Sequence, residues 1–90
     1  MPEILQILRY EYVPDIVERR AEHRPAHLEM IQAFHADGRL RIAGAVGDPP
    51  SYALLAFRDA ASAEAFAADD PYVASGLVTS WTVEPWNVVT

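Results

Sequence analysis

Four segments of the chain carry the apolar patterns of strands. Residues 3–13 are too rich in β-branched and aromatic side chains, and too few, for a helix, so they predict a first strand. Residues 40–47 and 51–58 predict two strands joined by a turn at Asp48, Pro49 and Pro50. Residues 77–89 predict the last strand, in which Pro85 requires a bulge or an edge position because it lacks a backbone N–H.

Helical spacing fills the intervals between these strands. Pro14 and Asp15 open a helical stretch that runs to Arg20, and Pro25 interrupts it, either as a kink or as the first residue of a second helix. That second stretch keeps its spacing as far as Gly38, the expected left-handed cap. The alanine-rich residues 61–68 predict another helix with Ser62 as a candidate cap, and residues 71–75 a short turn that ends at Gly76.

The order of elements is therefore β-α-β-β-α-β, the ferredoxin-like α+β arrangement of a four-stranded antiparallel sheet with two helices on one face. The predicted third strand is apolar on both sides, with Tyr52, Leu54 and Ala56 opposite Ala53, Leu55 and Phe57. The chain has no spare segment to cover the second face of the sheet. A second copy of the same sheet would cover it, so we expect a homodimer with a small-molecule pocket between the sheets or at their edges.

Composition narrows the class of protein. Ninety residues predict one domain, 1–90, and an apolar fraction of 51% exceeds what one small core needs. The absence of cysteine excludes disulfides and cysteine nucleophiles. A net charge of −6 without a basic run argues against nucleic acid or an anionic membrane as partner. We expect a cytoplasmic protein, since the apolar stretches are far too short for a membrane span and the N-terminus lacks the basic, then apolar, pattern of a secretion signal.

His27 is the histidine best placed for chemistry. On a helical wheel it lies in the apolar stripe with Ile31 and Phe34, which predicts that it faces the sheet, either as a core histidine or as a functional one. In the first turn of a helix the dipole favours neutral imidazole, a usable base near neutral pH. His35 falls at the border of the stripe and His23 has no helical partner, so we expect no metal site from the three histidines.

Asp70 is the candidate carboxylate. Asp followed by Pro71 starts a helix by itself, and capping alone would explain the residue. If the fold brings Asp70 next to His27, the immobilised carboxylate would fix the imidazole tautomer and form a proton-transferring dyad. Asp37 and Asp69 are rival carboxylates, both expected at helix ends.

Aromatic and basic residues supply weaker candidates. Most aromatics are expected in the core or at an interface, and only Tyr72 and Trp86 are singled out as candidate pocket walls. The arginines are scattered and suit a solvated face. Arg24, beside the break that leads to His27, is the one best placed to hold an anionic substrate group.

Two segments resemble the signature regions of the YciI-related (YCII) family. They are RPAHLEMIQAFHADGRLRIAG, residues 24–44, with the motif R-x-x-H-L, and ADDPYVASGLVTSWTVEPW, residues 68–86, with the motif D-P-Y-V-x-x-G. The resemblance implies a ferredoxin-like dimer whose sheets face each other and a deep pocket with a functional His and Asp, here His27 and Asp70. The turn between Val46 and Ser51 is short where some relatives carry long insertions, so the pocket rim and the substrate are expected to differ.

The resemblance also implies a function. The member of the family with the best-defined chemistry is a dehydrochlorinase that acts on a chlorinated hydroxyhydroquinone, and the related muconolactone isomerases share its architecture. The leading hypothesis is a cofactor-free lyase or isomerase that moves a proton on a small cyclic or phenolic metabolite, with His27 as base and Asp70 orienting it. The alternatives are a non-catalytic ligand-binding or accessory dimer and a cofactor-independent monooxygenase, which would consume oxygen.

Overall fold

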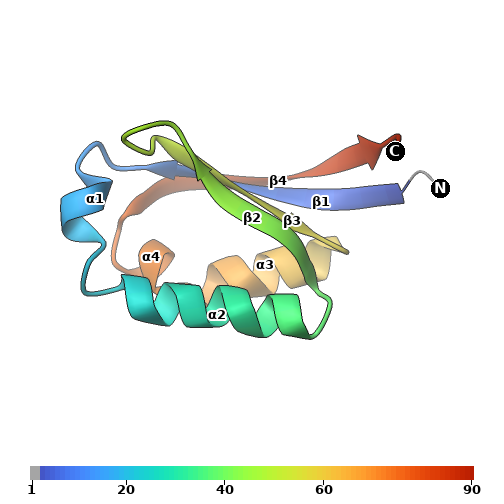
Figure 1. The fold of residues 1–90 in the computed structure, drawn as a ribbon, viewed down its shortest axis with the longest axis horizontal. Coiled ribbons are helices and arrows are strands. Elements are labelled where there is room, and N and C mark those ends of the chain that lie inside the picture. Colours follow the sequence, from blue (N-terminus) through green and yellow to red (C-terminus); the bar gives the residue numbers. More distant parts are fainter. Residues whose placement is uncertain (1–2) are drawn as a thin grey trace.

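A computed structural model describes residues 3–90, which form one antiparallel sheet with helices on one side (Figure 1). Within this described range the elements follow in the order β1 (Glu3–Tyr12), α1 (Ile16–Arg19), α2 (Arg24–Ala36), β2 (Leu40–Val46), β3 (Tyr52–Phe57), α3 (Ala60–Asp69), α4 (Pro71–Ala74) and β4 (Val78–Val88). The ferredoxin-like β-α-β-β-α-β order is confirmed, with α2 and α3 as the two covering helices. The one-turn helices α1 and α4 are additions to it.

The sheet order is β2-β3-β1-β4, and every neighbouring pair of strands is antiparallel. β4 is an edge strand, the second of the two alternatives, a bulge or an edge position, that Pro85 predicted. No register shift occurs at Pro85, which lies opposite Gln6; the irregularity of the β1–β4 pair falls between Glu11 and Tyr12 instead. An edge position therefore accommodates the missing N–H of Pro85 without a bulge.

Pro25 lies at the start of a second helix, which begins one residue earlier at Arg24, and does not kink a longer one. It lies in the first turn of α2, where its missing N–H would have no helical partner in any case. The preceding stretch is helical only from Ile16 to Arg19, shorter than the sequence predicted. Gly38 follows α2 with a φ of +86°, so the predicted left-handed cap is confirmed.

The predicted cap of the alanine-rich helix was wrong. α3 begins at Ala60, and the carboxylate of Asp59 accepts a hydrogen bond from the backbone N–H of Ser62 at 2.7 Å. Asp and Ser are equally good N-caps, and here Asp59 lies two residues after the end of β3 while the two alanines that follow it extend the helix backwards. Ser62 is buried in the helix body instead.

The segment after α3, predicted as a turn, is the one-turn helix α4. Asp70 caps it, since its carboxylate accepts a hydrogen bond from the N–H of Tyr72, and Pro71 occupies its first turn. The capping role predicted for Asp70 is confirmed. Gly76 follows with a φ of +81° and lets the chain turn into β4.

The core lies between the sheet and the helices. Leu8, Leu55, Phe57 and Phe66 have at most 2% of their surface exposed there. The opposite face of the sheet has no covering element among residues 3–90, as Figure 1 shows. No helix in this described range combines the length and the apolar character that crossing a membrane requires.

Candidate active site

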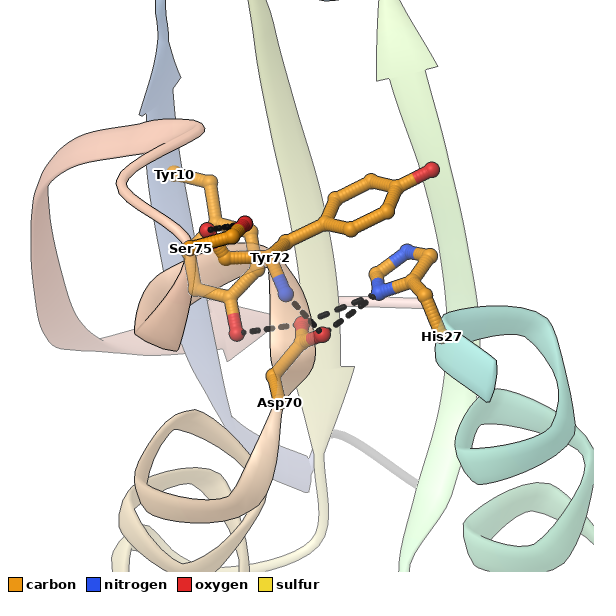
Figure 2. Close-up of polar contacts among 5 residues, drawn as sticks. All are labelled: Tyr10, His27, Asp70, Tyr72 and Ser75. Atoms are coloured by element: carbon orange, nitrogen blue, oxygen red, sulfur yellow. Dashed lines mark hydrogen bonds and ion pairs between the residues drawn. The ribbon is translucent and has the colours of Figure 1, made fainter. Parts of the chain in front are cut away.

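His27 and Asp70 meet beneath the sheet although 43 positions separate them in the chain. His27 comes from the first turns of α2 and Asp70 from the start of α4, and both are buried, with 6% and 0% of their surface exposed. The Nδ1 atom of His27 lies 2.9 Å from each carboxylate oxygen of Asp70 (Figure 2). The structure thus brings together the two residues that the sequence selected independently.

Asp70 collects two further hydrogen bonds. The hydroxyl of Tyr10, from near the C-terminal end of β1, donates to Oδ2 at 2.8 Å, and the backbone N–H of Tyr72 donates to Oδ1 at 3.0 Å. Figure 2 shows these donors and the imidazole converging on the carboxylate. A carboxylate surrounded by three donors is held as an anion in one orientation, which compensates for its removal from water.

The tautomer of His27 follows from this arrangement. An ionised carboxylate accepts hydrogen bonds and cannot donate them, so Nδ1 of His27 carries the proton. In the neutral ring Nε2 is then the atom with a free lone pair, and it lies on the side of the ring away from Asp70 (Figure 2). A histidine held in this way is competent to accept a proton at Nε2.

Tyr72 fixes the plane of the imidazole. Its ring stacks on His27 with centroids 3.7 Å apart and planes 7° apart. Its hydroxyl points away from Asp70, across the imidazole and toward β2 (Figure 2). Together the carboxylate and the stacked phenol leave the imidazole little freedom to rotate.

A cavity of about 290 Å³ lies against this pair, between α2 and the strands β2 and β3. Its lining includes His27, Tyr72, Tyr12, Arg20 and Arg24, and the remaining walls are mostly aliphatic. The volume is at the lower end for small-molecule sites and suits a ligand of one ring. Arg24 and Tyr72, both predicted to contact a substrate, therefore line the same cavity as His27.

Trp86 lies elsewhere. It is 45% exposed on the open face of the sheet and lines a hollow of about 370 Å³ together with apolar residues such as Ile7, Ile42 and Leu54. The structure does not bring Trp86 into the cavity of His27. Among residues 3–90, only apolar side chains and glycine line this second hollow.

The other titratable candidates also lie apart from the cavity. The Nδ1 atom of His35 is 3.1 Å from the carbonyl oxygen of Leu40, and His23 lies beside Glu22. Asp37 is exposed and pairs with Arg39, and Asp69 is exposed at the end of α3. Within residues 3–90 no three His, Asp or Glu side chains converge as metal ligands would.

Sequence reasoning missed three residues of the site. Tyr10 was expected only in the core or at an interface, Tyr12 likewise, and Arg20 was noted only as a helix end. Burial raises the pKa of Tyr12 to about 12, and burial with the nearby charge of Asp70 raises the pKa of Tyr10. Both phenols are therefore hydrogen-bond donors across the physiological range.

Comparison with known proteins agrees with the fold and with the motifs. The model of the YCII-related domain family matches residues 5–87. Protein YciI of Escherichia coli O6:H1 is 33% identical, with 96% of this chain and 99% of the relative covered, and so is Protein YciI of Shigella flexneri. An uncharacterized protein of Haemophilus influenzae is 32% identical over 86% of this chain and 90% of its own length.

One solved structure gives a close match of fold. It is the 5-chloro-2-hydroxyhydroquinone dehydrochlorinase TftG of Burkholderia phenoliruptrix AC1100, in complex with 2,5-dihydroxybenzoquinone. Its TM-score is 0.73 at 19% sequence identity, over 92% of this chain and 93% of the other. At this identity the likeness concerns the fold.

Proposed function

Because this chain belongs to the family of YCII-related domains, we propose that it is a cofactor-free lyase or isomerase for a small cyclic or phenolic metabolite. The observation that supports this most is the orientation of His27: a buried carboxylate holds Nδ1 while Nε2 lies on the other side of the ring. The solved relative of the same fold, a dehydrochlorinase with a bound dihydroxybenzoquinone, supports the choice of ring compounds.

In the proposed reaction His27 is the base and Asp70 positions it. The lone pair of Nε2 takes a proton from a ring carbon or hydroxyl, and the electron pair of that bond forms a new double bond. In an elimination the leaving group, such as chloride, departs with its own bonding pair; in an isomerisation the proton returns to another carbon of the same ring. Asp70 stabilises the imidazolium that forms, because its charge lies 2.9 Å from Nδ1.

The test compares turnover with stability in His27→Asn. The amide nitrogen of Asn takes roughly the place of Nδ1, so the hydrogen bond to Asp70 is kept while the base is removed. Chlorinated hydroxyhydroquinones and muconolactones, followed by ultraviolet absorbance, are the first substrates to screen. We expect wild type to convert a member of the panel and His27→Asn to lose the reaction with its thermal midpoint retained. Unchanged turnover in His27→Asn would remove His27 from the chemistry and favour a binding protein.

We also propose that the open face of the sheet pairs with the same face of a second copy. Ile42, Trp86 and Leu54 are 66%, 45% and 37% exposed there, and the neighbouring hollow is apolar. A strand such as β3, apolar on both sides, is typical of a sheet covered on both faces. Sedimentation should show a dimer that Leu54→Glu dissociates. Val17→Glu, which adds the same charge at a 43% exposed site on α1, should leave the dimer intact; equal effects would refute the pairing.

A further inference from the structure

The seven basic residues of the chain are all arginines, and they fall into two groups. Five form ion pairs with carboxylates: Arg9 with Glu11, Arg19 with Asp15, Arg39 with Asp37, Arg41 with Glu3 and Arg58 with Asp59. Arg20 and Arg24 have no carboxylate within 4.0 Å among residues 3–90, and both line the cavity of His27. Although the chain has thirteen acidic residues, the two guanidinium groups that lack a carboxylate partner within residues 3–90 line the same cavity.

The hydroxyl of Tyr72 is a second, independent sign of a missing ligand. Tyr72 is 1% exposed, and its hydroxyl oxygen is buried without a hydrogen-bond partner in the described part of the chain. Buried hydroxyls normally have a partner, so one that does not needs a reason. Here the hydroxyl extends beyond the imidazole ring, on the side of Nε2 (Figure 2), and Tyr72 lines the cavity.

The remaining lining fits the same kind of ligand. No aspartate or glutamate from residues 3–90 lines the cavity. Its polar side chains are mainly hydrogen-bond donors, namely those of Tyr12, Arg20, Arg24 and Tyr72. The amide of Gln32 can both donate and accept a hydrogen bond. With Asp70 ionised and His27 neutral, two guanidinium groups and one carboxylate leave a net charge of +1 around the cavity. A ligand with a single negative charge would neutralise it.

We propose that this cavity binds a small planar organic anion, an aromatic or enolic acid whose charged oxygens are held by Arg20 and Arg24 while another oxygen accepts a hydrogen bond from Tyr72. Guanidinium groups suit an anion whose charge is shared by two oxygens. The position of the ligand next to Nε2 rests on the proposed function of His27. The binding of an anion does not.

The experiment uses 4-hydroxybenzoate as probe and 4-hydroxybenzamide as its neutral analogue of nearly equal shape. Affinities are measured by NMR titration of the full chain, with the His27 and Tyr72 ring signals reporting the place of binding. A charge-assisted hydrogen bond supports a loss of about tenfold in affinity for the acid in Arg20→Gln or Arg24→Gln, and no loss for the amide. Tyr72→Phe should weaken binding of the acid as well.

Arg19→Gln is the matched control. It removes the same charge from the residue next to Arg20, but Arg19 pairs with Asp15 and does not line this cavity. We expect the affinity of the acid to stay within about twofold in this variant, because exposed charges act weakly through water. An equal loss in Arg19→Gln, equal affinities for acid and amide, or no saturable binding of the acid would each overturn the proposal.

His27→Asn separates the two proposals. We expect it to retain binding of the acid, because Arg20 and Arg24 are untouched. If turnover fails to depend on His27 while the acid still binds through the arginines, the proposed catalysis falls and the anion site stands. If turnover requires His27 but the acid binds equally well to the arginine variants, the anion site falls alone.

Discussion

Tyr10→Phe and Tyr72→Phe form a matched pair that tests the hydrogen-bond network directly. Each substitution removes one oxygen from a tyrosine that is almost fully buried, with 0% and 1% of its surface exposed. The two hydroxyls differ in one respect: that of Tyr10 donates to Asp70 at 2.8 Å, whereas that of Tyr72 has no partner within residues 3–90. Because the two side chains are equal in size and almost equally buried, a difference between the free energies of unfolding of the two variants reports the hydrogen bonding of the hydroxyl that each has lost.

The expected magnitudes follow from the partners. A hydrogen bond to a charged group contributes about 1.5–3 kcal/mol, so Tyr10→Phe should lower the free energy of unfolding by that amount. For a domain of this size the loss corresponds to a fall in thermal midpoint on the order of 10 °C. Tyr72→Phe removes a polar group that was buried without compensation, so we expect a free energy of unfolding equal to that of wild type or higher.

Urea denaturation followed by tryptophan fluorescence measures both variants, at one protein concentration because association would shift the midpoint. An unchanged m-value would show that the denatured state is the same in each variant. Equal destabilisation by the two substitutions would refute the assignment, since it would mean that the hydroxyl of Tyr72 is paired as well as that of Tyr10.

Three further perturbations test other parts of the structure. Asp70→Ala removes the carboxylate that His27 and Tyr10 share, so it should lower the free energy of unfolding by about 3–5 kcal/mol, as measured by urea denaturation. A loss below about 1 kcal/mol would show that the pair of His27 and Asp70 is solvated. Burial raises the pKa of Tyr12 from 10.0 to about 12, so the contribution of the neutral phenol to stability is complete below pH 10 and is lost as pH rises toward 12. Tyr12→Phe should therefore flatten the fall in the free energy of unfolding at alkaline pH. An unchanged dependence of this free energy on pH would contradict the prediction. Hydrogen bonds from the side chain and the backbone of Ser62 lower the pKa of the Asp59 carboxyl, so the stabilisation by this carboxylate is present at neutral pH and is lost as acid protonates it. Helix stability by circular dichroism should fall further in Asp59→Ala than in Ser62→Ala, which keeps the backbone N–H as a donor, and the reverse order would restore Ser62 as the cap.

Local patterns were sufficient for the order of strands and covering helices, for the inward placement of His27 and for the capping by Asp70. A step of about 100° per residue places His27 with Ile31 and Phe34, and these positions do face the sheet. The D-P dipeptide predicted the cap at Asp70 because N-cap chemistry depends only on neighbours in the chain. Pro85 likewise limited β4 to a bulge or an edge position, and the structure shows the edge position.

Contacts between distant segments were beyond such patterns. Strand alternation placed Tyr10 toward the interior, but its bond to Asp70 spans 60 positions and depends on how α4 packs against β1. Arg20 and Arg24 stand four positions apart on either side of the helix break, a spacing that sequence reasoning left unused. Their significance appears only when the other five arginines are seen to be paired. Trp86 was selected for its aromatic character alone, which does not distinguish the two faces of the sheet.

Asp70 shows why two explanations that compete at the level of sequence can both hold in the structure. Its Oδ1 atom accepts the N–H of Tyr72 and so caps α4, while both of its oxygens face the imidazole of His27. The cap fixes the carboxylate relative to Tyr72, and the ring of Tyr72 in turn stacks on His27. One short helix start therefore sets the position, the plane and the tautomer of the imidazole together. It follows that a carboxylate supplied from outside α4 could pair with His27 but would not hold it in the same plane, because the backbone that binds Asp70 is also the backbone that carries Tyr72.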